Sequence, residues 1–340
     1  MTGFAIEVYQ NEYLPDSVTE VNAVLTVTAS GAVSAAGTAA AEVIVIDCSG
    51  SMEYPRDKMA AAIRATEAAV DALRDGVEFA VVAGTGQARL VYPAAGLVAA
   101  GAKTRAAAKA AVRRLKPEGG TAIGRWLALA SQLFEGREGA LKHVILLTDG
   151  RNEHEKPEEL ERVLAACAGR FVCDCRGVGT GWQVAELRRV ATALLGTVDI
   201  VADPAGLAAD FRAMATAAMG KSVADVALRL WTPQSAKVKF VKQVAPEVVD
   251  LTGKRTESGP RTGDYPTGSW GAESRDYQLC VEVTPGRVGD VMLAARASLV
   301  AGADVLAQGL VKAVWTDDAA LSTRISKEVA HYTGQAELAA

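Results

Sequence analysis

The chain has 340 residues, half of them hydrophobic and 22% charged, so it is globular and long enough for two domains. Its net charge of −4 at pH 7 and its pI near 5.6 argue against nucleic-acid binding, which needs concentrated positive charge. No run approaches the roughly 20 apolar residues of a membrane span, and no secretory signal opens the chain. The five cysteines, an odd number in a large chain, indicate a reduced, cytoplasmic protein rather than a disulfide framework.

Residues 1–40 open with two segments, 4–10 and 18–28, in which apolar and polar residues alternate. This alternation is typical of strands that are buried on one face only. We therefore assign the region to the first strands of an antiparallel β-sandwich that a later part of the chain completes.

Residues 41–219 alternate strand-like and helix-like segments, which predicts a doubly wound α/β domain with a Rossmann-like, mostly parallel sheet. The predicted strands are 42–47, 77–83, 89–92, 143–149, 171–178 and 198–201. The predicted helices, which carry apolar residues at helical spacing, lie near 59–73, 104–115, 123–134, 157–164, 184–194 and 207–219. Thr104 is the expected N-cap of the second helix.

Beyond Gly220 the helical period disappears, and we assign residues 220–316 to the remainder of the β-sandwich. The α/β domain is then an insertion in that sandwich. Within this region, 252–271 is rich in Gly, Pro, Thr and Ser and is predicted to be a long loop. Residues 317–340 are predicted to form a C-terminal helix, with one face made by Leu321, Ile325 and Val329.

Oxygen-bearing side chains stand at the ends of two predicted buried strands. Asp47, Ser49 and Ser51 follow the first of these strands, Asp149 ends the other, and Thr121 begins a predicted helix. Because the carboxyl ends of strands in an open α/β sheet meet at one edge, we expect these side chains to converge. Carboxylates and hydroxyls are hard ligands that suit Mg²⁺, with Mn²⁺ or Ca²⁺ as alternatives, better than zinc.

The segments DCSGSM, GGT and LLTDG resemble the metal-ion-dependent adhesion site of von Willebrand factor type A domains. All five positions of that family's D-x-S-x-S…T…D pattern are matched, and the resemblance extends over residues 41–219. It implies that Ser49, Ser51 and Thr121 approach the metal while the two aspartates often act through water. It also implies that an acidic residue of a protein partner completes the coordination. The similarity is to bacterial intracellular members, which often work with AAA⁺ ATPases of the MoxR type or in metal insertion.

The chemistry of these oxygen ligands favours the same function independently of the family resemblance. A cation held mainly by neutral hydroxyls and water keeps much of its positive charge. It therefore favours an external carboxylate, because charge-assisted contacts to a partly desolvated ion are strong. The leading hypothesis is a metal-dependent protein-binding module rather than an enzyme, in which a partner's Asp or Glu binds the metal. Arg151, Asn152 and Glu53 lie close by in sequence and are candidates for selecting that partner.

Two other functions remain open from the sequence. A Mg²⁺-dependent phosphotransferase of the haloacid-dehalogenase type would use Asp47 as nucleophile, but it needs a carboxylate at position 49, which is serine. In the other alternative, the metal site is intact but the β-sandwich carries the binding surface.

The cysteines suggest two further interpretations, neither of which we favour. A zinc site built from Cys167, Cys173 and Cys175 lacks a C-x-x-C pair and a second set of ligands, which favours buried thiols. Cys48 stands beside Asp47, but the sequence offers no resolving partner for a redox role.

Overall fold

The computed structural model describes residues 3–30, 38–55, 57–149, 151–178, 184–201, 203–324 and 326–338. Contacts between residues divide the chain into two compact units. One unit comprises 34–224, and the other combines 1–33 with 225–340. Within the described ranges, every helix is too short or too polar to cross a bilayer.

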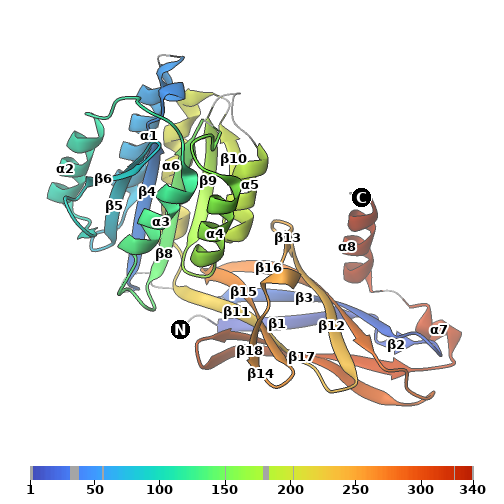
Figure 1. Cartoon of the computed structure of the whole chain (residues 1–340). Coiled ribbons are helices and arrows are strands. Elements are labelled where there is room, and N and C mark those ends of the chain that lie inside the picture. The colour runs from blue at the N-terminus through green and yellow to red at the C-terminus, as the bar shows by residue number, and fades with distance from the viewer. Residues whose placement is uncertain are drawn as a thin grey trace. The chain divides into compact units, whose positions relative to one another are not determined.

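The unit formed by 34–224 is built on a mixed sheet in the order β10-β9-β8-β4-β5-β6, with β7 paired beside β5 (Figure 1). Neighbouring strands from β10 to β5 are parallel, whereas β6 and β7 run antiparallel to β5. The strands are β4 (Ala40–Asp47), β5 (Glu78–Gly84), β6 (Ala88–Tyr92), β7 (Val98–Ala99), β8 (Leu141–Thr148), β9 (Val172–Val178) and β10 (Val198–Val201). The predicted mostly parallel sheet is confirmed.

Helices cover both faces of this sheet, as expected for a doubly wound domain. The helices are α1 (Asp57–Ala72), α2 (Ala102–Val112), α3 (Ile123–Leu133), α4 (Pro157–Cys167), α5 (Val184–Ala193) and α6 (Leu207–Met219), with short 3₁₀ turns η1 (Gly50–Glu53) and η2 (Pro204–Gly206). On one face, Ile44 and Ile46 of β4 share a core with α1, α2 and α6. On the other, Val43 and Val45 share a core with α3, α4 and α5. The continuous apolar run of β4 therefore reflects burial on both faces.

The other unit contains two largely antiparallel sheets, in the orders β1-β3-β16-β12-β13 and β14-β15-β11-β17-β18-β2. They pack against one another along β1 and β18, where a side chain at Gly309 would lie 2.7 Å from Cγ2 of Val8. The two-residue β2 is an exception because it pairs parallel to β18. The strands are β1 (Gly3–Gln10), β2 (Tyr13–Leu14), β3 (Glu20–Ser30), β11 (Val223–Trp231), β12 (Ala236–Ala245), β13 (Val249–Asp250), β14 (Thr256–Gly259), β15 (Thr262–Trp270), β16 (Glu273–Val283), β17 (Val291–Ala301) and β18 (Asp304–Trp315).

The predicted long loop at 252–271 is wrong. After the short turn η3 (Thr252–Lys254), this segment forms the antiparallel pair of β14 and β15. Strand β15 buries Gly263, Tyr265 and Thr267 at every second position. The sequence does not show this alternation as a strand pattern, because of glycine, tyrosine and threonine only tyrosine is large and apolar.

The single helix predicted for 317–340 is also wrong, because two helices, α7 (Ala319–Ser322) and α8 (Lys327–Leu338), occupy this region. Ser326 separates them by accepting the N–H of Val329 on its hydroxyl, as an N-cap does. Ile325, which was expected on the apolar face, lies outside the described residues.

Thr104 is not the N-cap of α2. The helix begins two residues earlier, and the Thr104 hydroxyl accepts the N–H of Gly101 at 2.8 Å from within the first turn.

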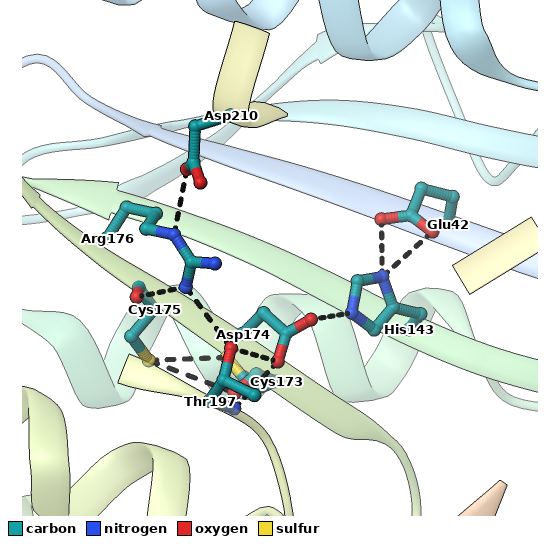
Figure 2. Close-up of polar contacts among 8 residues, drawn as sticks. All are labelled: Glu42, His143, Cys173, Asp174, Cys175, Arg176, Thr197 and Asp210. Carbon is teal, nitrogen blue, oxygen red and sulfur yellow. Dashed lines mark hydrogen bonds and ion pairs between the residues drawn. The ribbon is translucent and has the colours of Figure 1, made fainter. Parts of the chain in front are cut away.

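Glu42, His143 and Asp174 form a chain of polar side chains (Figure 2) near the starts of β4, β8 and β9, away from the carboxyl ends of these strands. Imidazole Nδ1 of His143 lies 2.8 Å from Glu42 Oε1, and its Nε2 lies 3.0 Å from Asp174 Oδ2. Burial opposes a charge on His143, but the two carboxylates outweigh it and raise its pKa to about 10. Burial in turn raises the pKa of Glu42. Hydrogen bonds from His143 and Thr197 lower the pKa of Asp174 despite its burial.

This buried imidazolium predicts a pH dependence of stability. Because the pKa of His143 is raised from about 6.5 in the unfolded chain to about 10 in the fold, its contribution is complete below pH 6.5 and is lost as the pH rises towards 10. Over that window the group lowers the free energy of unfolding by up to about 1.4 kcal/mol per pH unit. Urea denaturation across the window should show a smaller slope for H143Q than for wild type. The exposed-histidine control H331Q should keep the wild-type slope, and equal slopes in H143Q and wild type would contradict the prediction.

A second prediction concerns the close contact between β5 and α3. A Cβ at Gly84 would lie 2.4 Å from two ring atoms of the fully buried Trp126. We expect G84A to lower the free energy of unfolding by about 1–3 kcal/mol, the usual cost of overpacking a core. The control is G253A, because a Cβ at Gly253 would meet no atom within 4 Å. Similar denaturation midpoints for the two variants would show that the contact between Gly84 and Trp126 leaves room for a methyl group, and would contradict the prediction.

Candidate functional site

The site begins where β4 and β8 end side by side. Strand β4 is the topological switch point of the sheet, because the strands that follow it in the chain lie on both sides of it, β5 on one side and β8 on the other. The register pairs Ile46 with Leu147, so Asp47 lies beside Thr148. Asp47 Oδ1 accepts the N–H of Ser49 at 2.7 Å, and its Oδ2 accepts the Thr148 hydroxyl. Both oxygens of this fully buried carboxylate are therefore occupied by the loop that follows β4 and by the end of β8.

The loop after β4 carries the two serines onto the second aspartate. The Ser51 hydroxyl donates to Asp149 Oδ1 at 2.7 Å, and the hydroxyls of Ser49 and Ser51 are 2.9 Å apart. Since the Ser51 proton is directed at Asp149, Ser49 is the donor of the pair. The loop is anchored by Met52, which is fully buried. Ser49, Ser51 and Asp149 thus form one continuous hydrogen-bonded chain.

The segment that carries Thr121 is fastened to the same loop through main-chain hydrogen bonds. The N–H of Glu118 donates to the carbonyl of Cys48 at 2.6 Å, and the N–H of Gly50 donates to the carbonyl of Gly119 at 3.0 Å. Thr121 itself is 4% exposed. Four of the five sequence-predicted residues are therefore joined by direct hydrogen bonds around β4 and β8. Thr121 is held near them by the main-chain hydrogen bonds of Glu118 and Gly119.

The two glycines before Thr121 have a geometric role that the sequence did not reveal. Gly119 has a φ of +71°, which favours glycine. A Cβ at Gly120 would lie 2.2 Å from the ring of His154, whose Nδ1 accepts the N–H of Thr121 at 3.2 Å. Gly119 is thus favoured by its backbone conformation, and Gly120 is required by close packing.

The loop after β8 caps α3 from a distance. The side-chain oxygen of Asn152 accepts the N–H of Ile123 at 2.8 Å, and Glu155 Oε2 accepts the N–H of Gly124 at 2.8 Å. Asn152 was expected to help select a ligand, but it is 9% exposed and its amide also donates to Glu155. Its role is to hold the start of α3, directly after Thr121. Sequence patterns identify capping residues only next to the helix that they cap. Asn152 caps a helix that begins 29 residues earlier, so its role was not predicted.

Lys58, in the first turn of α1, is a further residue of the site that was not predicted from the sequence. Its ammonium forms an ion pair with Asp149 Oδ2 and donates to the carbonyl of Ser51 at 3.0 Å. The Lys58 side chain is 12% exposed, and that of Asp149 is 1% exposed. The sequence holds one indication of this role. A cation in the first turn of a helix is unfavourable to the helix dipole, so such a lysine needs a partner elsewhere.

Burial sets the protonation of the residues beside this site. It raises the pKa of Asp47 to about 6, although hydrogen bonds from Thr148 and Ser49 act in the opposite direction. Burial also raises the pKa of the Cys48 thiol to about 12. Because a reactive cysteine needs a thiolate, Cys48 is unsuited to a redox role near neutral pH.

The donor set fits a hard divalent cation. It combines two carboxylates with serine and threonine hydroxyls, and the Lys58 ammonium already occupies a cation position on Asp149. In the part of the chain that the structure describes, no group of three or more His, Cys, Asp and Glu side chains is arranged to hold a metal. Cys173 and Cys175 are buried free thiols with sulfurs 3.9 Å apart.

Comparison with known proteins gives consistent matches. The sequence profile of the von Willebrand factor type A domain matches residues 41–200. An uncharacterized protein from Synechocystis sp. is 32% identical over 216 residues, which are 62% of this chain. The chain spans about half the length of that curated relative, 49%.

Two solved structures extend the similarity to nearly the whole chain. The ArnB paralog VWA2 from Sulfolobus acidocaldarius shares the fold, with 14% identity and a TM-score of 0.61 over 98% of this chain and 82% of its own. A von Willebrand factor type A protein from Catenulispora acidiphila is 55% identical, with a TM-score of 0.96 over 99% of this chain and 79% of its own. The chain therefore belongs to the von Willebrand factor type A family.

Proposed function

We propose that the chain is a metal-dependent protein-binding module in which Mg²⁺ is held at the carboxyl ends of β4 and β8. The residues that would hold it are Asp47, Ser49, Ser51, Thr121 and Asp149. The observation that carries the proposal is the hydrogen-bonded chain from Ser49 through Ser51 to Asp149, next to Asp47 on the neighbouring strand end. Mn²⁺ and Ca²⁺ suit the same oxygen donors.

The distribution of exposure supports an external ligand. Asp47 and Asp149 are buried and already accept hydrogen bonds within the site, whereas Ser51 is exposed to solvent. When bound, the ion would supply a positive charge that neutral hydroxyls neutralise only in part. A carboxylate from a partner is the complementary group for such a charge.

The partner is therefore a protein that presents an Asp or Glu side chain, and an AAA⁺ ATPase of the MoxR type is the class we propose. The five free, buried cysteines support a reducing compartment, which we propose is the cytoplasm. Glu53 and Arg151 are exposed and remain our candidates for selecting the partner.

The phosphotransferase alternative has no support. Asp47 would have to attack phosphorus, yet it is 0% exposed and both of its oxygens accept hydrogen bonds from Ser49 and Thr148. Position 49, where that chemistry needs a second carboxylate, is a serine that is 2% exposed.

The metal site is tested by removing its oxygens. We expect S51A and D149A each to lose Mg²⁺ binding in isothermal titration calorimetry, because each removes a donor that the rest of the site cannot replace. The far-ultraviolet circular dichroism should be unchanged. D199A is the matched control, since Asp199 is an exposed aspartate of β10 in the same unit. Wild-type affinity in both S51A and D149A would refute the assignment.

Partner binding is tested by removing the metal. Proteins of a bacterial extract retained on the immobilised chain in Mg²⁺ should be released by EDTA, because their carboxylate binds through the ion. A matched column of D149A should retain far less of the same proteins. Retention that persists in EDTA and on D149A would place the binding surface elsewhere, as in the alternative that uses the β-sandwich.

A further inference from the structure

The Lys58 ammonium makes two contacts with the residues of the candidate metal site. It pairs with Asp149 Oδ2, while Asp149 Oδ1 accepts the Ser51 hydroxyl at 2.7 Å. It also donates to the carbonyl of Ser51 at 3.0 Å. A single positive charge of the chain itself thus rests on the carboxylate that a divalent ion would need.

The position of Lys58 in α1 is unfavourable for reasons of local structure. It is the second residue of the helix, where the partial positive charge of the helix N-terminus repels a cation. Holding a long side chain at 12% exposure also costs conformational entropy. The attraction of the buried Asp149 carboxylate offsets both costs, since an unpaired buried charge is more expensive still.

We propose that Lys58 is a tethered counter-ion that competes with the divalent metal for Asp149. The inference rests on the proposed function and adds a regulatory device to the same site. Without metal, the ammonium neutralises Asp149 and keeps the hydrogen-bonded chain of Ser49, Ser51 and Asp149 in place. Metal binding at Asp149 requires the ammonium to leave, because the ammonium and the divalent ion would repel each other on one carboxylate.

This competition sets the metal affinity below the value that the oxygen ligands alone would give. The free energy of the Lys58–Asp149 pair is subtracted from that of metal binding, as for any ligand that must displace an internal one. The site therefore needs a higher concentration of metal to be half filled than the oxygen ligands alone would require.

The test compares Mg²⁺ affinities of the full chain by isothermal titration calorimetry at one ionic strength. K58M should bind Mg²⁺ at least about tenfold more tightly than wild type, because the competing charge is gone. K58R, which keeps the charge, should stay close to wild type. K103M is the matched control, since Lys103 is likewise the second residue of a helix, α2, but is exposed.

A second readout is independent of metal affinity. Without metal, K58M should melt at a lower temperature than wild type because Asp149 has lost its counter-ion. Addition of Mg²⁺ should raise its melting temperature by more than that of wild type. If wild type binds Mg²⁺ and D149A does not, but K58M binds no more tightly than wild type, the proposed function stands and the counter-ion role is overturned. Equal affinities for K58M and K58R that both exceed wild type would also overturn it, since charge would then not be the cause.

Discussion

Burial of β4 on both faces is the constraint on which the rest of the 34–224 unit depends. All eight of its residues are buried, so its two charged side chains must find partners inside the protein. Glu42 does so through His143, and Asp47 does so through Thr148 and the main chain of Ser49. His143 and Thr148 on β8 lie beside Glu42 and Asp47 in the register of the two strands. The pairing of β4 with β8 therefore gives each buried carboxylate of β4 a hydrogen-bond partner.

Hydrogen bonds between loops hold the candidate site together at the ends of β4 and β8. The loops after β4 and β8 and the segment before α3 are each fastened to one another by hydrogen bonds that involve main-chain groups. Asn152 and Glu155 satisfy N–H groups in the first turn of α3, which otherwise have no partner within the helix. Side chains that must meet an ion within a few tenths of an ångström are best held in this way.

The sequence was sufficient for those parts of the molecule in which a periodic pattern and a polar strand end coincide. The apolar run 43–46 and the aspartate after it predicted β4 and its place in a parallel sheet. They also predicted that polar side chains meet at the carboxyl ends of the strands, where Asp47, Ser49, Ser51 and Asp149 are joined by hydrogen bonds. The β14–β15 pair was missed because its inward residues include Gly263 and Thr267, which do not read as apolar. The break between α7 and α8 depends on Ser326 as a local cap, which a helical period does not detect.

Lys58 shows a different limit of prediction. Its unfavourable place in the first turn of a helix can be read from the sequence, but its partner Asp149 lies 91 residues later and is known only from the fold. In a structural metal site the ion is needed to neutralise its ligands, and the protein unfolds without it. Here the protein itself supplies partners for both carboxylates: the Thr148 hydroxyl and the Ser49 N–H donate to Asp47, and the Lys58 ammonium and the Ser51 hydroxyl donate to Asp149. Every carboxylate oxygen of Asp47 and Asp149 has a partner within the chain. On the proposed function, a divalent ion at this site would be exchanged against these internal contacts, and the fold would persist while the ion and a partner's carboxylate bind and leave.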